Sequence, residues 1–101
     1  MPKGQFNDLL WFLAVAEERS FTRAAAKLGI AQSTLSHTIK RLETQMGIRL
    51  LTRTTRNVVP TEAGERLRQT LAPRVEEIEA EIALLTELRD KPDLPPENWT
   101  V

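Results

Sequence analysis

The sequence contains no cysteine and no long apolar run in its 101 residues. Without cysteine the chain can form no disulfide and no zinc site of the usual cysteine-rich kind. A helix needs roughly 20 apolar residues to span a bilayer, and no stretch approaches that length. Residues 1–4 also lack the apolar character of a secretory signal. We therefore expect a cytoplasmic protein with no membrane partner and no cofactor.

Groups for catalysis are equally scarce. His37 is the single histidine, and one histidine without cysteine is not a standard metal site. A catalytic histidine would also need an orienting carboxylate and a nucleophile, and the sequence signals neither. We expect the chain not to be an enzyme.

Charge is unevenly distributed along a chain whose net charge is zero. Residues 1–61 hold nine basic and four acidic residues, a net charge of +5, whereas residues 62–101 hold five basic and ten acidic residues, a net charge of −5. A basic front half can attract phosphate, and an acidic back half should point away from it. Chance is the alternative explanation of this asymmetry.

The first stretch of the chain has the pattern of one amphipathic helix. Asn7 is a suitable N-cap for this helix, which we expect to end near residues 19–20. Its apolar side chains repeat at the spacing of one buried helix face, and they are Leu9, Phe12, Leu13 and Ala16.

Two further helices follow in the order of a helix-turn-helix. The second helix has Ser20 or Thr22 as its N-cap and ends at Gly29, where a left-handed residue is needed. The third helix spans about residues 32–46 and ends at Gly47. Its predicted core face consists of Leu35, Ile39, Leu42 and Met46.

The opposite face of the third helix is polar and carries no acid before Glu43. It consists of Gln32, Ser33, Ser36, His37 and Lys40. Gln32 can pair with adenine through its amide, His37 can donate to guanine, and Lys40 can reach phosphate or guanine. Thr34 and the two serines are short enough to approach bases or phosphates. A plain solvated face is the alternative, but such a face usually contains glutamates.

The start of the second helix offers a further DNA contact. In helix-turn-helix proteins this helix crosses the phosphate backbone. The hydroxyl of Thr22 and the guanidinium of Arg23 suit phosphate contacts there. Capping by Thr22 and a solvated Arg23 are the alternative, and both roles can hold at once.

Residues 48–60 are predicted to form a short β-hairpin with a basic tip. Apolar residues flank the tip, residues 52–57, which contains Arg53 and Arg56. A hairpin directly after the third helix is the wing of a winged helix. An arginine there can enter the minor groove or touch phosphate, which gives affinity but little sequence discrimination. A solvated hairpin is the alternative.

Residues 62–90 are predicted to form one long helix that Thr61 caps. A narrow heptad-like stripe runs along it, and it consists of Leu67, Leu71, Val75, Ile78, Ile82 and Leu85. A small domain cannot cover such a stripe, so we expect a partner helix in a homodimer. Packing on its own domain alone and a break into two helices at Pro73 are the alternatives. Residues 91–101 are expected to be a tail or linker.

Several motifs of the sequence resemble the N-terminal DNA-binding domain of LysR-type regulators. The resemblance covers about residues 6–90, and its motifs are residues 21–28, 32–43, 47–53 and 60–64. It implies a mainly α fold, with a winged helix-turn-helix over residues 1–61 followed by a linker helix that pairs antiparallel with its partner. It matches the wing arginine of the family to Arg53. It also implies an effector-binding domain, which these residues do not include.

Three positions depart from the family pattern. Ala31 stands where many members have serine, Ser33 where many have proline, and His37 where many have arginine. Because all three lie on or beside the polar face of the third helix, we expect them to affect which bases are read and to leave the fold unchanged.

Together these patterns predict sequence-specific binding of double-stranded DNA for transcription regulation. A homodimer, or a higher oligomer with an effector domain, would read a partly palindromic site. The helix 32–46 would lie in the major groove and the hairpin 52–57 near the minor groove. The alternative is a short interaction module that forms heterodimers with a full-length relative through its linker helix.

Overall fold

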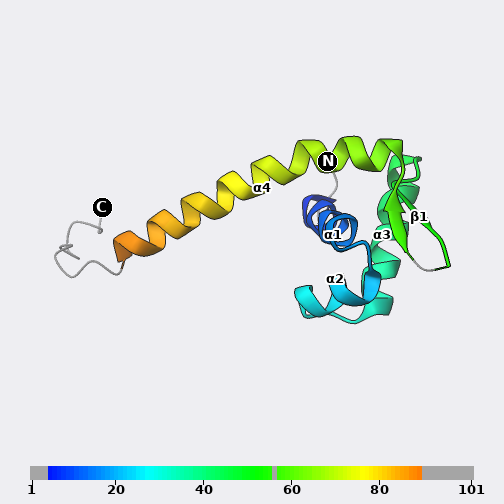
Figure 1. The fold of residues 1–101 in the computed structure, drawn as a ribbon, viewed down its shortest axis with the longest axis horizontal. Coiled ribbons are helices and arrows are strands. Elements are labelled where there is room, and N and C mark those ends of the chain that lie inside the picture. Colours follow the sequence, from blue (N-terminus) through cyan, green and yellow to red (C-terminus); the bar gives the residue numbers. More distant parts are fainter. Residues whose placement is uncertain (1–4, 56, 90–101) are drawn as a thin grey trace.

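Four helices and one two-stranded antiparallel sheet follow one another in the computed structural model, which describes residues 5–55 and 57–89. The elements are α1 (Gln5–Glu18), α2 (Phe21–Leu28), α3 (Gln32–Met46), β1 (Leu51–Arg53), β2 (Val58–Pro60) and α4 (Glu62–Arg89). Figure 1 shows α4 crossing above α1 and then extending away from the other elements. The predicted mainly α winged helix-turn-helix with a long final helix is confirmed. The expected tail, residues 91–101, lies outside the described residues.

One apolar core joins α1, α2, α3 and the hairpin. Its fully buried large side chains are Phe12, Val15, Leu35, Leu42 and Leu50. The predicted core face of α3 is confirmed except for Met46, whose side chain is 41% exposed. Gly47 ends α3 directly after Met46, so the chain turns away and leaves this last turn uncovered.

The ends of the helices follow largely from local chemistry. The side chain of Ser20 accepts a backbone hydrogen bond and caps α2. Gly29 and Gly47 adopt left-handed φ angles of 72° and 70°, as the sequence predicts. Asn7 as the first cap is wrong, because α1 already begins at Gln5. First-turn N–H groups have no intrahelical partner in any case, so an exposed asparagine is tolerated there.

The hairpin is shorter than the predicted range. β1 and β2 pair antiparallel with Leu51 opposite Pro60 and Arg53 opposite Val58. Pro60 is the last residue of β2, where its missing N–H does not interrupt the ladder. Ile48 lies before β1 and is 45% exposed, so it belongs to the turn and not to the core.

One continuous helix, α4, follows the hairpin. The Thr61 hydroxyl accepts a hydrogen bond from the backbone N–H of Gly64 at 3.0 Å, which confirms the predicted cap. The helix passes through Pro73 without ending, so the alternative of two shorter helices is wrong. Pro73 is exposed, and water can therefore reach the backbone carbonyl that loses its partner. Among the described residues, no helix combines the length and apolar character needed to cross a membrane.

The apolar stripe of α4 divides into a covered part and an uncovered part. Leu67 and Leu71 pack against the core of the same chain. Further along, Ile78, Ile82 and Leu85 are 53%, 56% and 54% exposed. Large apolar side chains at this exposure indicate an unoccupied contact surface.

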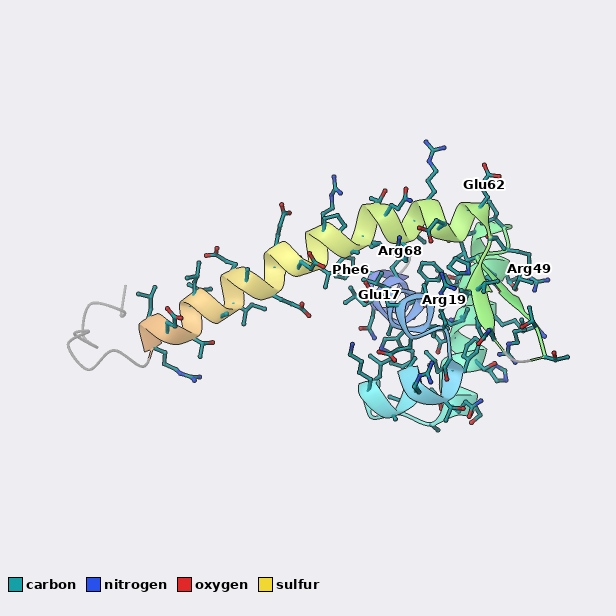
Figure 2. All side chains as sticks on the ribbon, viewed as in Figure 1. Phe6, Glu17, Arg19, Arg49, Glu62 and Arg68 are labelled. Atoms are coloured by element: carbon teal, nitrogen blue, oxygen red, sulfur yellow. The ribbon has the colours of Figure 1, made fainter. Side chains whose placement is uncertain are left out.

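A charged side chain on the near half of α4 also faces α1. Figure 2 shows Arg68 on the side of α4 that faces α1, near Glu17 and Arg19. Arg68 donates to the carboxylate of Glu65, and this hydrogen bond holds the pKa of Glu65 below its usual value. Because Leu67 and Leu71 pack on the core, the near half of α4 belongs structurally to the domain, whereas the far half extends beyond it.

Gly64 marks a close approach of α4 to the hairpin. A Cβ placed on Gly64 would lie 1.9 Å from the backbone oxygen of Leu50 and 2.9 Å from its carbonyl carbon. Both atoms belong to the backbone, so neither can rotate away. Only a residue without a side chain fits this junction.

We predict that Gly64→Ala lowers the free energy of unfolding by about 3 kcal/mol or more, because overpacking costs ~1–3 kcal/mol even where side chains can adjust. The control is Gly47→Ala, which meets no atom within 4 Å and suffers only from its φ of +70°. That strain costs about 1–2 kcal/mol. Urea unfolding followed by circular dichroism measures both. An equal loss in the two variants would contradict the close approach.

Candidate nucleic-acid interface

The polar face of α3 is exposed as a continuous surface. Ser36 is half-buried, and the other members are exposed, namely Gln32, Ser33, Thr34, His37 and Lys40. A groove of about 690 Å³ separates this face from the hairpin, with Ser36 and Lys40 on one side and Thr52 and Arg53 on the other. The structure therefore brings the predicted residues of α3 and of β1 to one side of the molecule.

A hydrogen bond joins the starts of α2 and α3. The Thr22 hydroxyl donates to the side-chain oxygen of Gln32 at 3.1 Å. This contact fixes the plane of the Gln32 amide and leaves its amino group available to donate outward. Thr22 thus acts on the position of Gln32, in addition to any phosphate contact of its own.

Arg23 does not join this group. Its guanidinium donates to the backbone oxygen of Glu18 at 3.0 Å, and its Nε lies 3.7 Å from the Glu18 carboxylate. The side chain is therefore turned back toward the end of α1. A phosphate contact by Arg23 stays a prediction that requires it to leave Glu18.

Arg53 is held by two other elements. Its guanidinium lies 4.1 Å from the centre of the Phe21 ring on α2, which is a favourable cation–π distance. It also donates to the hydroxyl of Ser36 on α3. The sequence does not predict these contacts, since the three residues are far apart along the chain. Arg56, the other predicted arginine of the hairpin, lies outside the described residues.

A polar hollow of about 230 Å³ lies between the turn after α1 and the hairpin. Its lining includes Arg19, Thr22, Gln32, Arg53 and Asn57. Arg19 and Asn57 are additions to the predicted residues. Nothing local in the sequence indicates them, because their proximity depends on how the hairpin docks. Hydroxyls, amides and guanidinium groups in one concavity suit an anionic ligand.

The carboxylate of Glu43 ties the hairpin to α3. It accepts hydrogen bonds from the backbone N–H groups of Leu50 at 2.8 Å and Leu51 at 3.0 Å. Arg49 approaches the same oxygen at 3.9 Å. The first acid after the polar face is thus turned toward the backbone, and the exposed side of α3 keeps its acid-free character.

Asp8 and Arg41 form a further tie, between α1 and α3. Asp8 is only 5% exposed, and both of its carboxylate oxygens accept from one nitrogen of Arg41 at 3.2 and 3.3 Å. The Arg41 side chain is itself 58% exposed, so its removal would leave the buried carboxylate of Asp8 without its partner. This pair therefore helps to fix the orientation of α3, and the separation of 33 residues hides it from sequence patterns.

Comparison with protein families matches residues 6–65 to a family described as bacterial regulatory helix-turn-helix proteins, lysR family. The chain is 53% identical over 92 residues to the HTH-type transcriptional regulator PgrR of Escherichia coli (strain K12), covering 91% of this chain and 31% of that protein. It is 42% identical over 86 residues to the HTH-type transcriptional regulator PtxR of Pseudomonas aeruginosa, covering 85% and 28%. The chain therefore spans about a third of the length of these curated relatives.

Solved structures share most of this arrangement. The BenM DBD in complex with catB site 1 DNA superposes with a TM-score of 0.71 at 36% identity, covering 84% of this chain and 94% of that one. The full-length virulence activator AphB of Vibrio cholerae gives a TM-score of 0.73 at 33% identity, covering 80% and 28%. Both superpositions extend beyond the residues of the winged helix-turn-helix into α4.

We predict that Glu43→Ala loosens the hairpin, because it leaves the N–H groups of Leu50 and Leu51 without their partner. A buried donor without a partner costs about 1–3 kcal/mol, so stability should fall by roughly 2–3 kcal/mol. Amide hydrogen exchange at Leu50 and Leu51 should also accelerate. Gln45→Ala, an exposed site on the same helix, is the control. Unchanged exchange at both amides would contradict the role given to Glu43.

Proposed function

The chain belongs to the LysR family of bacterial helix-turn-helix regulators, and on this basis we propose that it binds double-stranded DNA sequence-specifically and regulates transcription. The observation that carries the proposal is the acid-free exposed face of α3 beside Arg53. A surface that offers amide, hydroxyl, imidazole and ammonium groups can bond base edges and phosphates together. The DNA complex of the related BenM DBD supports the same use of this fold.

In the proposed complex α3 lies in the major groove, which is wide enough for one helix. Gln32 stands at its N-terminal end, where side chains reach base edges, and His37 and Lys40 follow on the same face. The hairpin then approaches the minor groove next to the bound segment. The hollow lined by Arg19 and Asn57 would face the phosphate backbone between them.

We further propose that the chain acts as a homodimer. Beyond Val75 the stripe of α4 has no cover among the described residues, and Ile78, Ile82 and Leu85 stay more than half exposed. A helix of 28 residues is about 42 Å long, which is enough to pair with a second copy. Antiparallel pairing would relate two α3 helices by a two-fold axis and favour a partly palindromic site.

A second candidate uses the same stripe for a different partner. An uncovered apolar seam on α4 can also pair with the linker helix of a full-length relative, so the chain would form heterodimers. Mixing the two proteins and recording native mass spectra distinguishes the candidates. Separate homodimers alone would exclude the interaction module.

We predict that Gln32→Ala lowers affinity for the preferred site by roughly 5- to 150-fold, because it removes a base-edge contact worth about 1–3 kcal/mol. The probe is the duplex selected by the wild-type protein from a random pool. Affinity for a scrambled duplex and the salt dependence should change little, since Gln32 carries no charge. Titrations at several salt concentrations measure both.

Gln45→Ala is the matched control, because it removes the same side chain at the far end of α3. Equal losses on the selected and the scrambled duplex would contradict base reading by Gln32. A wild-type protein that prefers no duplex even in dilute salt would contradict the proposed function itself.

We predict that Ile82→Glu raises the dissociation constant of the homodimer by roughly two orders of magnitude or more, because it places a charge inside an apolar seam. Ala80→Glu adds the same charge to an exposed position of α4 outside the stripe and should leave the dimer intact. Sedimentation equilibrium measures both. A dimer mass that Ile82→Glu does not change would rule out this seam.

A further inference from the structure

Three elements hold the guanidinium of Arg53 in one place. Arg53 stands at the end of β1, stacks on Phe21 of α2 and donates to the hydroxyl of Ser36 on α3. Phe21 is itself only 7% exposed, so its ring provides a fixed platform. These two contacts favour one position of the exposed Arg53 side chain, beside the proposed base-reading helix.

This contact changes what the Ser36 hydroxyl can recognise. A serine hydroxyl has one donor hydrogen and two acceptor lone pairs. The guanidinium occupies a lone pair and polarises the O–H group, which strengthens donation and weakens further acceptance. No described residue accepts from this hydroxyl. Its hydrogen is therefore available, and the adjacent positive charge repels amino groups and attracts acceptors.

We propose that Arg53 and Ser36 read DNA as one unit, in which Ser36 donates to an acceptor on the major-groove edge of a base pair. The acceptors with this chemistry are N7 and O6 of guanine, O4 of thymine and N7 of adenine, whereas cytosine presents only an amino donor. The N7 of adenine lies beside an amino group that the positive charge of Arg53 repels, so guanine and thymine are favoured. This inference rests on the proposed function and deepens it. Arg53 contributes sequence discrimination through Ser36, where the sequence alone predicts affinity with little discrimination.

The place of Ser36 favours a base over a phosphate. Gln32, Ser36 and Lys40 are spaced four residues apart, so they lie along one line of α3. Ser36 is the central and least exposed member of that line. When a helix binds in the DNA major groove, the central line of its bound face meets the base edges on the floor of that groove, whereas the phosphates lie along its walls. A short side chain on that line therefore faces a base.

The first arm of the test uses the free protein. Proton NMR should show the Arg53 Cδ protons shifted upfield by the ring current of Phe21. Phe21→Leu, which keeps the apolar volume and removes the ring, should abolish that shift. Unshifted protons in the wild-type protein would overturn the inference without reference to DNA.

The second arm uses the selected duplex, with every base pair of one half-site replaced in turn and 7-deazaguanine placed at each guanine. At one position the wild-type protein should prefer guanine or thymine to cytosine by about three- to tenfold, the size of one hydrogen bond. Ser36→Ala and Arg53→Met should each remove that preference, and the double variant should remove no more. Arg66→Met is the control, because it deletes the same charge from an exposed position of α4 outside this site and should keep the preference.

Two results would overturn the inference and leave the proposed function standing. In one, Arg53→Met weakens binding to all duplexes but retains the preference at the position that Ser36→Ala affects. In the other, Ser36→Ala weakens all duplexes equally, which would assign its hydroxyl to phosphate. If the wild-type protein prefers no duplex at all, the proposed function fails, and this inference fails with it.

Discussion

The Glu43 carboxylate fixes the hairpin against α3, and the geometry of the proposed DNA-binding surface depends on that tie. It accepts from the backbone N–H groups of Leu50 and Leu51, directly at the start of the hairpin. β1 therefore begins at a set position beside α3, and Arg53 comes to lie over Phe21. A two-stranded hairpin is at best marginally stable alone in water. The Glu43 carboxylate thus helps to determine where Arg53 lies.

The same arrangement explains how a chain of zero net charge can present a surface suited to DNA. Asp8 is buried against Arg41, Glu18 is bound by Arg23 and Lys27 from α2, and Glu43 faces the backbone. Surface charges interact over about one Debye length, ~8–10 Å at ordinary salt. The far half of α4, which carries five of the seven acids of that helix, extends away from α3 and the hairpin (Figure 1). The positions of the acidic side chains therefore matter more for the α3 surface than the net charge of the whole chain.

Elements set by local chemistry could be predicted from the sequence, and those set by tertiary contacts could not. Gly29 and Gly47 gave the ends of two helices because a left-handed residue has a recognisable sequence signal. The hydrogen bond of Arg53 to Ser36 joins residues 17 apart, and no periodicity encodes such a pair. Met46 was misplaced for a related reason, since its spacing fits the core face but no neighbouring element covers it. The sequence could thus propose most residues of the candidate site, but it could not place Arg23 on Glu18, add Arg19 and Asn57, or predict the geometry.

Rigidity at the junction between the hairpin and α4 connects the two proposed surfaces. Gly64 packs so closely on the Leu50 backbone that no side chain fits between them, and Leu67 and Leu71 anchor the next turns to the core. α4 therefore cannot swing relative to α3 without unpacking the domain. In the proposed homodimer, whatever covers the stripe beyond Val75 would fix the separation of two α3 helices. The spacing of half-sites then becomes a property of α4, while the choice of bases within each half-site remains a property of α3 and the wing.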